Sequence, residues 1–152
     1  MNVRLVVSLS FLLSVIAGCN QAPPAPLGAV LTASGPSEGF VAGGNIDRIA
    51  YDETNNQVTI EGWHMLTPKT NQQTLSVLAE GAVSVASVTE RQRPDVVEAV
   101  GDEDLLNSGF VLVLDLDEGS RLTRLCIMFD DQHYGRRLLY SHSPDFPPCS
   151  VP

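Results

Sequence analysis

From Asn45 onward the chain consists of short runs in which apolar and polar residues alternate. Val58 and Ile60 share one face of such a run, and Leu75 and Val77 share one face of the next. Because successive side chains of a β-strand point to opposite faces, a period of two predicts strands. The first three runs each have Asn or Gly at a central turn, so we predict that they are hairpins. The runs are residues 45–63, 73–90, 110–131 and 136–141, the last being a single strand.

The run that begins at Phe110 departs from simple alternation. Val111 and Val113 make its second face apolar as well. A sheet face that is open to water is normally polar, so this second face needs a cover. We predict that the nearest helical segment, residues 95–106, supplies it. Without such a cover, the apolar patch would be a binding site for a partner.

One segment has the features of a short helix. Asp95 is the expected N-cap after Pro94, and Glu98 follows three residues later, as in a capping box. About seven short strands and one helix predict an all-β fold, a two-sheet antiparallel sandwich of the immunoglobulin-like type. A small closed β-barrel is the alternative. We assign this domain to residues 41–152.

The first 18 residues have the pattern of a secretion signal. Arg4 gives a positively charged start, and residues 5–16 are apolar apart from three serines. As a helix this run would span about 18 Å, too short for the ~30 Å hydrocarbon core of a bilayer. The residues that follow, Ile16-Ala17-Gly18-Cys19, resemble the lipobox of bacterial lipoproteins.

That resemblance implies a lipid anchor. Cys19 would become the first residue of the mature chain, with a diacylglycerol thioether on its sulfur and an acyl chain such as palmitate on its amine. Asn20, where inner-membrane lipoproteins have Asp, implies the outer membrane, with the domain facing the periplasm or the cell surface. Residues 19–40 are rich in Pro, Ala, Ser and Gly, and are predicted to be a flexible tether with room for a short strand at residues 28–32.

Net charge excludes one class of partner. The chain has 18 acidic and 9 basic residues, for a formal net charge of −9, and loss of Arg4 with the signal would make it about −10. Such a chain is not expected to bind nucleic acid, whereas a basic protein remains an alternative partner.

The cysteines predict a disulfide. With Cys19 acylated, Cys126 and Cys149 are an even pair in an oxidising compartment. A bond between them would fasten the Pro-rich C-terminal segment to the strand that carries Cys126. A metal site is not expected, because His133, His142 and Cys149 match no compact zinc spacing.

Three sequence elements resemble those of a β-sandwich accessory domain of bacterial envelope proteins. They are Gly62-Trp63, "RQRPDV" from Arg91 to Val96, and "SGFVLVLDL" from Ser108 to Leu116. The resemblance covers roughly residues 44–140 and implies the sandwich fold. Such domains often accompany catalytic parts, and we expect no catalytic part within these 152 residues.

Four residues are candidates for ligand binding: Trp63, Arg91, Arg93 and Asp95. The arginines suit either a bidentate hold on a ligand carboxylate or phosphate, or a pair with a carboxylate that fixes the corner before the helix. Trp63 suits either stacking on a sugar ring or packing in the core. Acidic residues at 102–104 and 115–118 leave a calcium site as an alternative.

These observations predict a non-enzymatic outer-membrane lipoprotein without a cofactor. No His has a Ser, Cys or second His at a useful spacing, so no general-base pair is expected. The sandwich would have a binding or structural role, with an envelope protein or a polysaccharide as partner. Two alternatives stay open: a module that binds glycan or peptidoglycan, and an acidic inhibitor or partner of a basic envelope protein.

Overall fold

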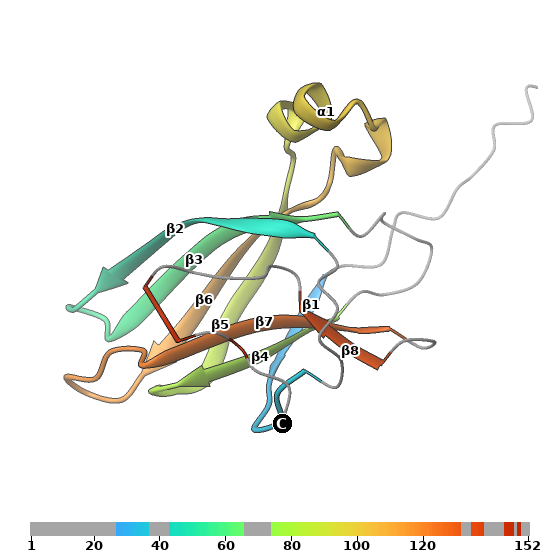
Figure 1. Cartoon of the computed structure of the whole chain (residues 1–152). Helices are drawn as coiled ribbons and strands as arrows, with labels where there is room; N and C mark the ends of the chain where they lie inside the picture. Colours follow the sequence, from blue (N-terminus) through green and yellow to red (C-terminus); the bar gives the residue numbers. More distant parts are fainter. Residues whose placement is uncertain are drawn as a thin grey trace, which may run out of the picture.

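Two four-stranded β-sheets pack face to face in this protein (Figure 1). The computed structural model describes residues 27–36, 43–65, 74–131, 135–138, 145–147 and 149. The predicted signal segment, Cys19, His133 and His142 lie outside these residues. The elements, in order, are β1 (Gly28–Leu31), β2 (Gly44–Asp52), β3 (Gln57–His64), β4 (Thr74–Glu80), β5 (Ala82–Arg91), α1 (Pro94–Val100), the 3-10 turn η1 (Glu103–Leu105), β6 (Gly109–Leu116), β7 (Arg124–Asp131) and β8 (Gly135–Leu138).

The strand order confirms the predicted immunoglobulin-like sandwich. One sheet has the order β2-β3-β6-β5 and the other β1-β4-β7-β8. Strands β2 to β8 therefore follow the four-plus-three arrangement of an immunoglobulin constant-type domain. The pairs are antiparallel except that β1 runs parallel to β4, which adds an eighth strand from within the predicted tether. The described strands form two open sheets, so the closed barrel is not supported.

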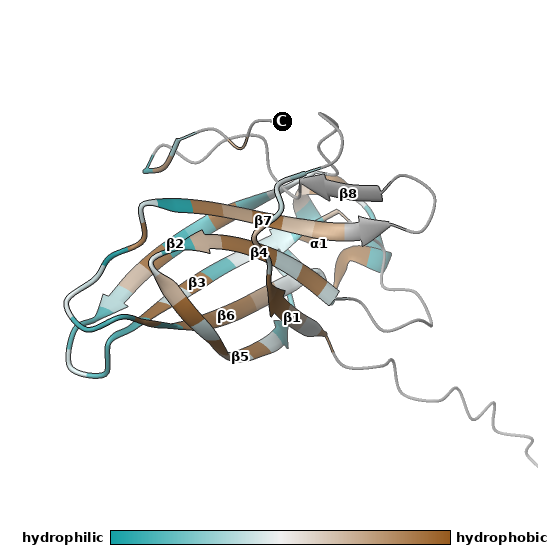
Figure 2. Ribbon diagram, turned by 90° about the horizontal axis from the view of Figure 1, so that it is seen from below, coloured by the Kyte–Doolittle hydropathy of each residue, from teal (hydrophilic) through white to brown (hydrophobic). Residues whose placement is uncertain are grey.

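The core lies between the two inner faces. Each central strand contributes apolar side chains at every second position, and these are almost completely shielded from water, which is the main favourable contribution to folding. Figure 2 shows hydrophobic residues recurring along these strands, whereas the turns at the left of that view are hydrophilic. The most buried members are Val58, Ile60, Leu75, Val77, Phe110, Leu112, Leu114, Leu125 and Ile127.

The first predicted hairpin is confirmed. β2 pairs with β3, and the turn between them is held by the Asp52 carboxylate, which accepts hydrogen bonds from the backbone N–H groups of Thr54 and Asn55. Asn56 adopts a positive φ of 50° there, a conformation that Asn tolerates better than most residues.

The other two predicted hairpins are wrong. β4 and β5 do not pair with each other, nor do β6 and β7, because each intervening turn carries the chain from one sheet to the other. At Gly81 the φ angle is 102°, and a Cβ there would lie 2.6 Å from the carbonyl oxygen of Arg121. Alternation identifies a strand but not its partner, and a Gly turn serves a sheet crossing as well as a hairpin.

The helix forms where predicted but does not cover the sheet. Asp95 is not its N-cap, because Arg93 occupies that position and both oxygens of Asp95 are bound to the Arg93 side chain. α1 ends at Val100, is capped by Gly101 with a φ of 78°, and projects with η1 from one end of the sandwich (Figure 1). Neither is a membrane-spanning helix, and the described part of the chain contains none.

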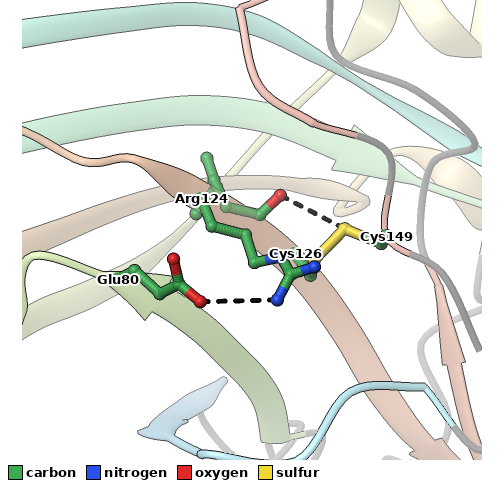
Figure 3. Close-up of a disulfide and its surroundings, with 5 residues drawn as sticks. Glu80, Arg124, Cys126 and Cys149 are labelled. Carbon is green, nitrogen blue, oxygen red and sulfur yellow. Dashed lines mark hydrogen bonds and ion pairs between the residues drawn. A yellow bond between two sulfur atoms is a disulfide. The ribbon is translucent and has the colours of Figure 1, made fainter. Parts of the chain in front are cut away.

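The predicted disulfide is present between Cys126 and Cys149. Their Cα atoms are 5.9 Å apart, and the Sγ atom of Cys149 lies 3.4 Å from the carbonyl oxygen of Leu125 (Figure 3). Cys149 packs against Cys126 and Met128, which are fully buried on the side of β7 that points away from the core. Cys149 therefore contributes to the cover of this side of β7.

We expect Cys149→Ala to lower the free energy of unfolding by about 3 kcal/mol, because the cross-link no longer restricts the unfolded chain. Urea unfolding of the mature domain with and without a reducing agent measures the effect. Reduction should bring the wild-type protein to the stability of the variant and leave the variant unchanged. A variant as stable as the oxidised wild type would contradict a stabilising role.

Candidate functional site

The outward-facing side of the sheet β2-β3-β6-β5, here called the outer face, is the candidate site. Along β3, Val58, Ile60, Gly62 and His64 are buried. Their neighbours Gln57, Thr59, Glu61 and Trp63 alternate with them and are only partly buried. Cross-strand register aligns Asn45, Trp63, Gly109 and Arg91 in one row and Ala50, Thr59, Val113 and Ser87 in another.

The outer face is partly apolar at its centre. On β6, Phe110, Leu112 and Leu114 point into the core, whereas Val111 and Val113 point outward and stay partly exposed. No helix or strand in the described residues packs over them, and α1 stands at the end of the sandwich instead (Figure 1). In the described part of the chain, the predicted helical cover is therefore absent, and Val111 and Val113 form a partly exposed apolar strip on this face.

Trp63 belongs to this face and not to the core. It is partly buried and lies outside both clusters of buried residues. Its partner across to β6 is Gly109, which has no side chain. The structure therefore does not support core packing of Trp63.

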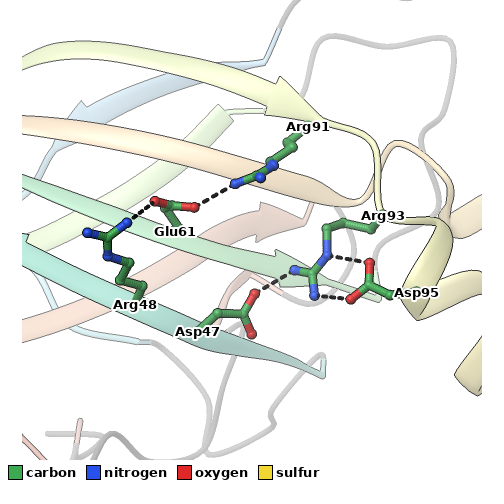
Figure 4. A network of polar contacts seen from close by, with 6 residues as sticks. All are labelled: Asp47, Arg48, Glu61, Arg91, Arg93 and Asp95. Atoms are coloured by element: carbon green, nitrogen blue, oxygen red, sulfur yellow. Dashed lines mark hydrogen bonds and ion pairs between the residues drawn. The ribbon is translucent and has the colours of Figure 1, made fainter.

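Three charged side chains form a chain across the outer face. The Glu61 carboxylate accepts a hydrogen bond of 2.6 Å from Arg91 and lies 3.6 Å from the guanidinium of Arg48 (Figure 4). β6 lies between the strands of Arg91 and Glu61. Arg91 is level with Gly109 of β6 and Glu61 is level with Val111, so the Arg91 side chain crosses β6 between these two positions. Both arginines are more than half exposed, so the network contributes little to stability and its guanidinium groups are accessible to a ligand. Alternation predicts the outward direction of Glu61, but the pairing with Arg48 required the strand register.

Arg93 has a different role from Arg91. Its Nε and one terminal nitrogen donate to the two oxygens of Asp95, at 2.9 and 2.6 Å, and the other terminal nitrogen donates to Asp47 at 2.6 Å (Figure 4). Only 15% of the Arg93 side chain is exposed. Of the two roles that the sequence leaves open for Arg93 and Asp95, ligand binding or a pair that fixes the corner before the helix, the structure shows the pair, which holds the corner between β5 and α1.

The corner depends on two local irregularities. Asp47 is the extra residue of a bulge in β2, which sets it apart from the paired residues on either side. Gly109 leaves space for the Arg93 stem, because a Cβ there would lie 2.7 Å from Cγ of Arg93 and 2.6 Å from the carbonyl oxygen of Arg91. A pocket of about 440 Å³ adjoins this corner and is lined largely by these paired groups.

The charges of the corner shift two pKa values. Hydrogen bonds from Arg93 lower the pKa of Asp95 to about 2, and the same bonds raise the pKa of Arg93. At the other end of the outer face, hydrogen bonds from Ser84 and Gln57 lower the pKa of Asp115. Both carboxylates are thus held in the charged form, which suits neither for general-base catalysis near neutral pH.

The acidic residues do not form a metal site in the part of the chain that the structure describes. No group of three or more His, Cys, Asp or Glu side chains converges there. Asp115, which the calcium alternative included, is instead engaged by Gln57 and Ser84. The calcium alternative therefore has no support.

A second pocket of about 370 Å³ lies at the opposite end of the sandwich. Tyr51 is the aromatic residue that lines this pocket. The guanidinium of Arg121 lies over the Tyr51 ring, 4.1 Å from the ring centre. Arg121 also lies 3.6 Å from Glu53. One side of the ring is thus covered by a cation, so this pocket is a poorer platform for a sugar than Trp63.

The lowered pKa of Asp95 makes stability depend on pH in the acidic range. Between pH 4 and pH 2 the unfolded chain binds a proton at Asp95 that the folded protein does not, so stability should fall as pH falls. Asp95→Asn should reduce the slope of unfolding free energy against pH there, and Asp117→Asn, outside the network, should not. Equal slopes for wild type and Asp95→Asn in urea unfolding would contradict the pairing.

Comparisons with known proteins do not assign this chain to a family. No family model matches it, and neither curated proteins nor solved structures gave a match.

Proposed function

We propose that this protein is a lipoprotein of the bacterial outer membrane, anchored through acylated Cys19. The lipobox-like sequence Ile16-Ala17-Gly18-Cys19, after a short apolar run with a positive start, supports the anchor. The Cys126–Cys149 disulfide supports an oxidising compartment such as the periplasm or the cell surface. Asn20 supports the outer membrane as its destination.

We further propose that the sandwich is a non-catalytic binding module that contacts an envelope partner through its outer face. The observation that carries this proposal is the partly exposed apolar centre at Val111 and Val113, over which no helix or strand of the described residues packs, beside Trp63 and the exposed Arg91. An apolar centre with a polar rim is the usual anatomy of a binding surface. The resemblance to envelope accessory domains agrees with a binding role.

A glycan such as peptidoglycan is the partner class that the outer face favours. Trp63 offers an indole for stacking on a sugar ring, from an outward-facing position of β3. Hydroxyl groups of Thr59, Ser87 and Thr89 share the face and suit hydrogen bonds to a saccharide. The charges on the network balance in part, so the face offers no concentrated acidic surface to a basic protein.

The lipid anchor predicts a specific loss on mutation. Cys19→Ser should abolish incorporation of labelled palmitate, because the acylated sulfur is absent. Fractionation of cells should then move the protein out of the outer membrane. Labelling or membrane retention equal to wild type would exclude Cys19 as the anchor.

The binding face predicts a position-dependent loss of binding. Val111→Glu should lower the affinity of the mature domain for isolated peptidoglycan and its soluble fragments at least about tenfold, by placing a charge in the apolar centre. Val83→Glu is the matched control, because Val83 is exposed on β5 near the opposite end.

Titration followed by the fluorescence of Trp63 measures both variants, with thermal unfolding to check that each is folded. Binding that neither shifts this fluorescence nor responds to Val111→Glu would contradict the proposed face. Absence of saturable binding to any cell-wall or polysaccharide fraction would reject the glycan and leave an envelope protein as the partner.

A further inference from the structure

The chain enters the sandwich at the end that carries α1. β1 is parallel to β4, with Gly28 paired to Thr74 at the first residue of each strand. The turn at Gly81 joins the far ends of β4 and β5, so Thr74 lies at the same end as Arg91, where the chain leaves β5 for α1. We call this the α1 end. The turns at residues 53–56 and 117–120 lie at the opposite end.

The distance from the proposed anchor to the sandwich is short. Eight residues separate Cys19 from Gly28, and an extended chain of that length spans about 30 Å at most. The pairing of β1 with β4 shortens the predicted tether, since residues 28–31 belong to the sheet. An anchored domain therefore stays within about one strand length of the bilayer surface, attached through its α1 end.

Among the described residues, the α1 end exposes more large apolar side chains than the opposite end. Met65, Val100 and Leu106 are 44%, 43% and 37% exposed, respectively. Met65 follows β3 and lies against Gly43, Val100 is the last residue of α1, and Leu106 follows η1. Among the described residues the other exposed large hydrophobics are Val30 in β1 and Val83 near the opposite end.

We propose that the α1 end rests on the bilayer that holds the anchor, with Val100 and Leu106 in its interfacial region. The inference rests on the proposed acylation of Cys19. The tether gives this end a high effective concentration at the surface, so a few apolar side chains suffice for contact. Glu98, Asp102 and Glu103 lie at the same end and are exposed, so the contact suits zwitterionic lipid and is weakened by anionic lipid.

This orientation has a consequence for the outer face. With the α1 end against the lipid, the strands stand away from the bilayer and the outer face is turned to the side. Trp63 and Arg91 then lie nearest the membrane, and Asp115 and Gln57 lie farthest from it. A partner can reach the face without displacing the lipid contact.

Fluorescence quenching by brominated lipid tests the orientation on the acylated mature protein in vesicles of zwitterionic phosphatidylcholine. In a Trp63→Phe background, Val100→Trp and, as a second reporter, Leu106→Trp place the only indole at the α1 end. Glu118→Trp places it in the exposed turn at the opposite end and is the matched control. Flotation of the vesicles reports the anchor independently.

We expect both α1-end reporters to lose a clear fraction of their intensity on brominated vesicles, and Glu118→Trp to lose none. Added anionic lipid should reduce the loss. A protein that floats with the vesicles but shows equal quenching at both ends, or none at the α1 end, would overturn the orientation and leave the anchor intact. A protein that does not float would overturn the anchor and the orientation with it.

Discussion

A strand that is apolar on both faces needs cover on both, and among the described residues β6 has a packed sheet on one face only. Its inner residues Leu112 and Leu114 are fully buried between the sheets, which fixes β6 at the centre of its sheet beside β3 and β5. Its outer residues Val111 and Val113 stay partly exposed. The candidate site follows from this imbalance, because an apolar centre within a polar sheet face favours contact with another molecule.

No other element in the described residues packs over that face. The opposite sheet has a similar two-sided strand, β7, but there Cys149 packs on Met128 and is fastened to Cys126. The helix, the other available cover, is held at the end of the sandwich by the Arg93 pairs with Asp95 and Asp47. Arg93 therefore contributes to the site indirectly. It holds the start of α1 at the corner, while Arg91 extends over β6.

The sequence predicts the elements of this structure better than their neighbours. Period-two alternation located the strands, and cysteine parity located the disulfide, because both depend on local pattern or simple counting. The hairpins at Gly81 and Gly119 were wrong, since the choice between pairing and crossing to the other sheet is made by tertiary packing. The outward direction of Val111 was predictable because it follows from local alternation. The position of the helix and the contact of Arg48 with Glu61 were not, because they depend on tertiary packing. The bulge at Asp47, which completes the corner, has no sequence signal that we recognise.

The central claim, that the outer face meets an envelope partner, is tested most directly by site-specific photo-crosslinking in intact cells. A photoreactive residue replaces Val113 on the outer face, Met65 at the α1 end or Glu118 in the opposite turn, one at a time, in the full-length chain. The account predicts one recurring adduct to an envelope component from position 113 and none from position 118. Adducts confined to positions 65 or 118, with none from position 113 in a folded protein, would contradict it.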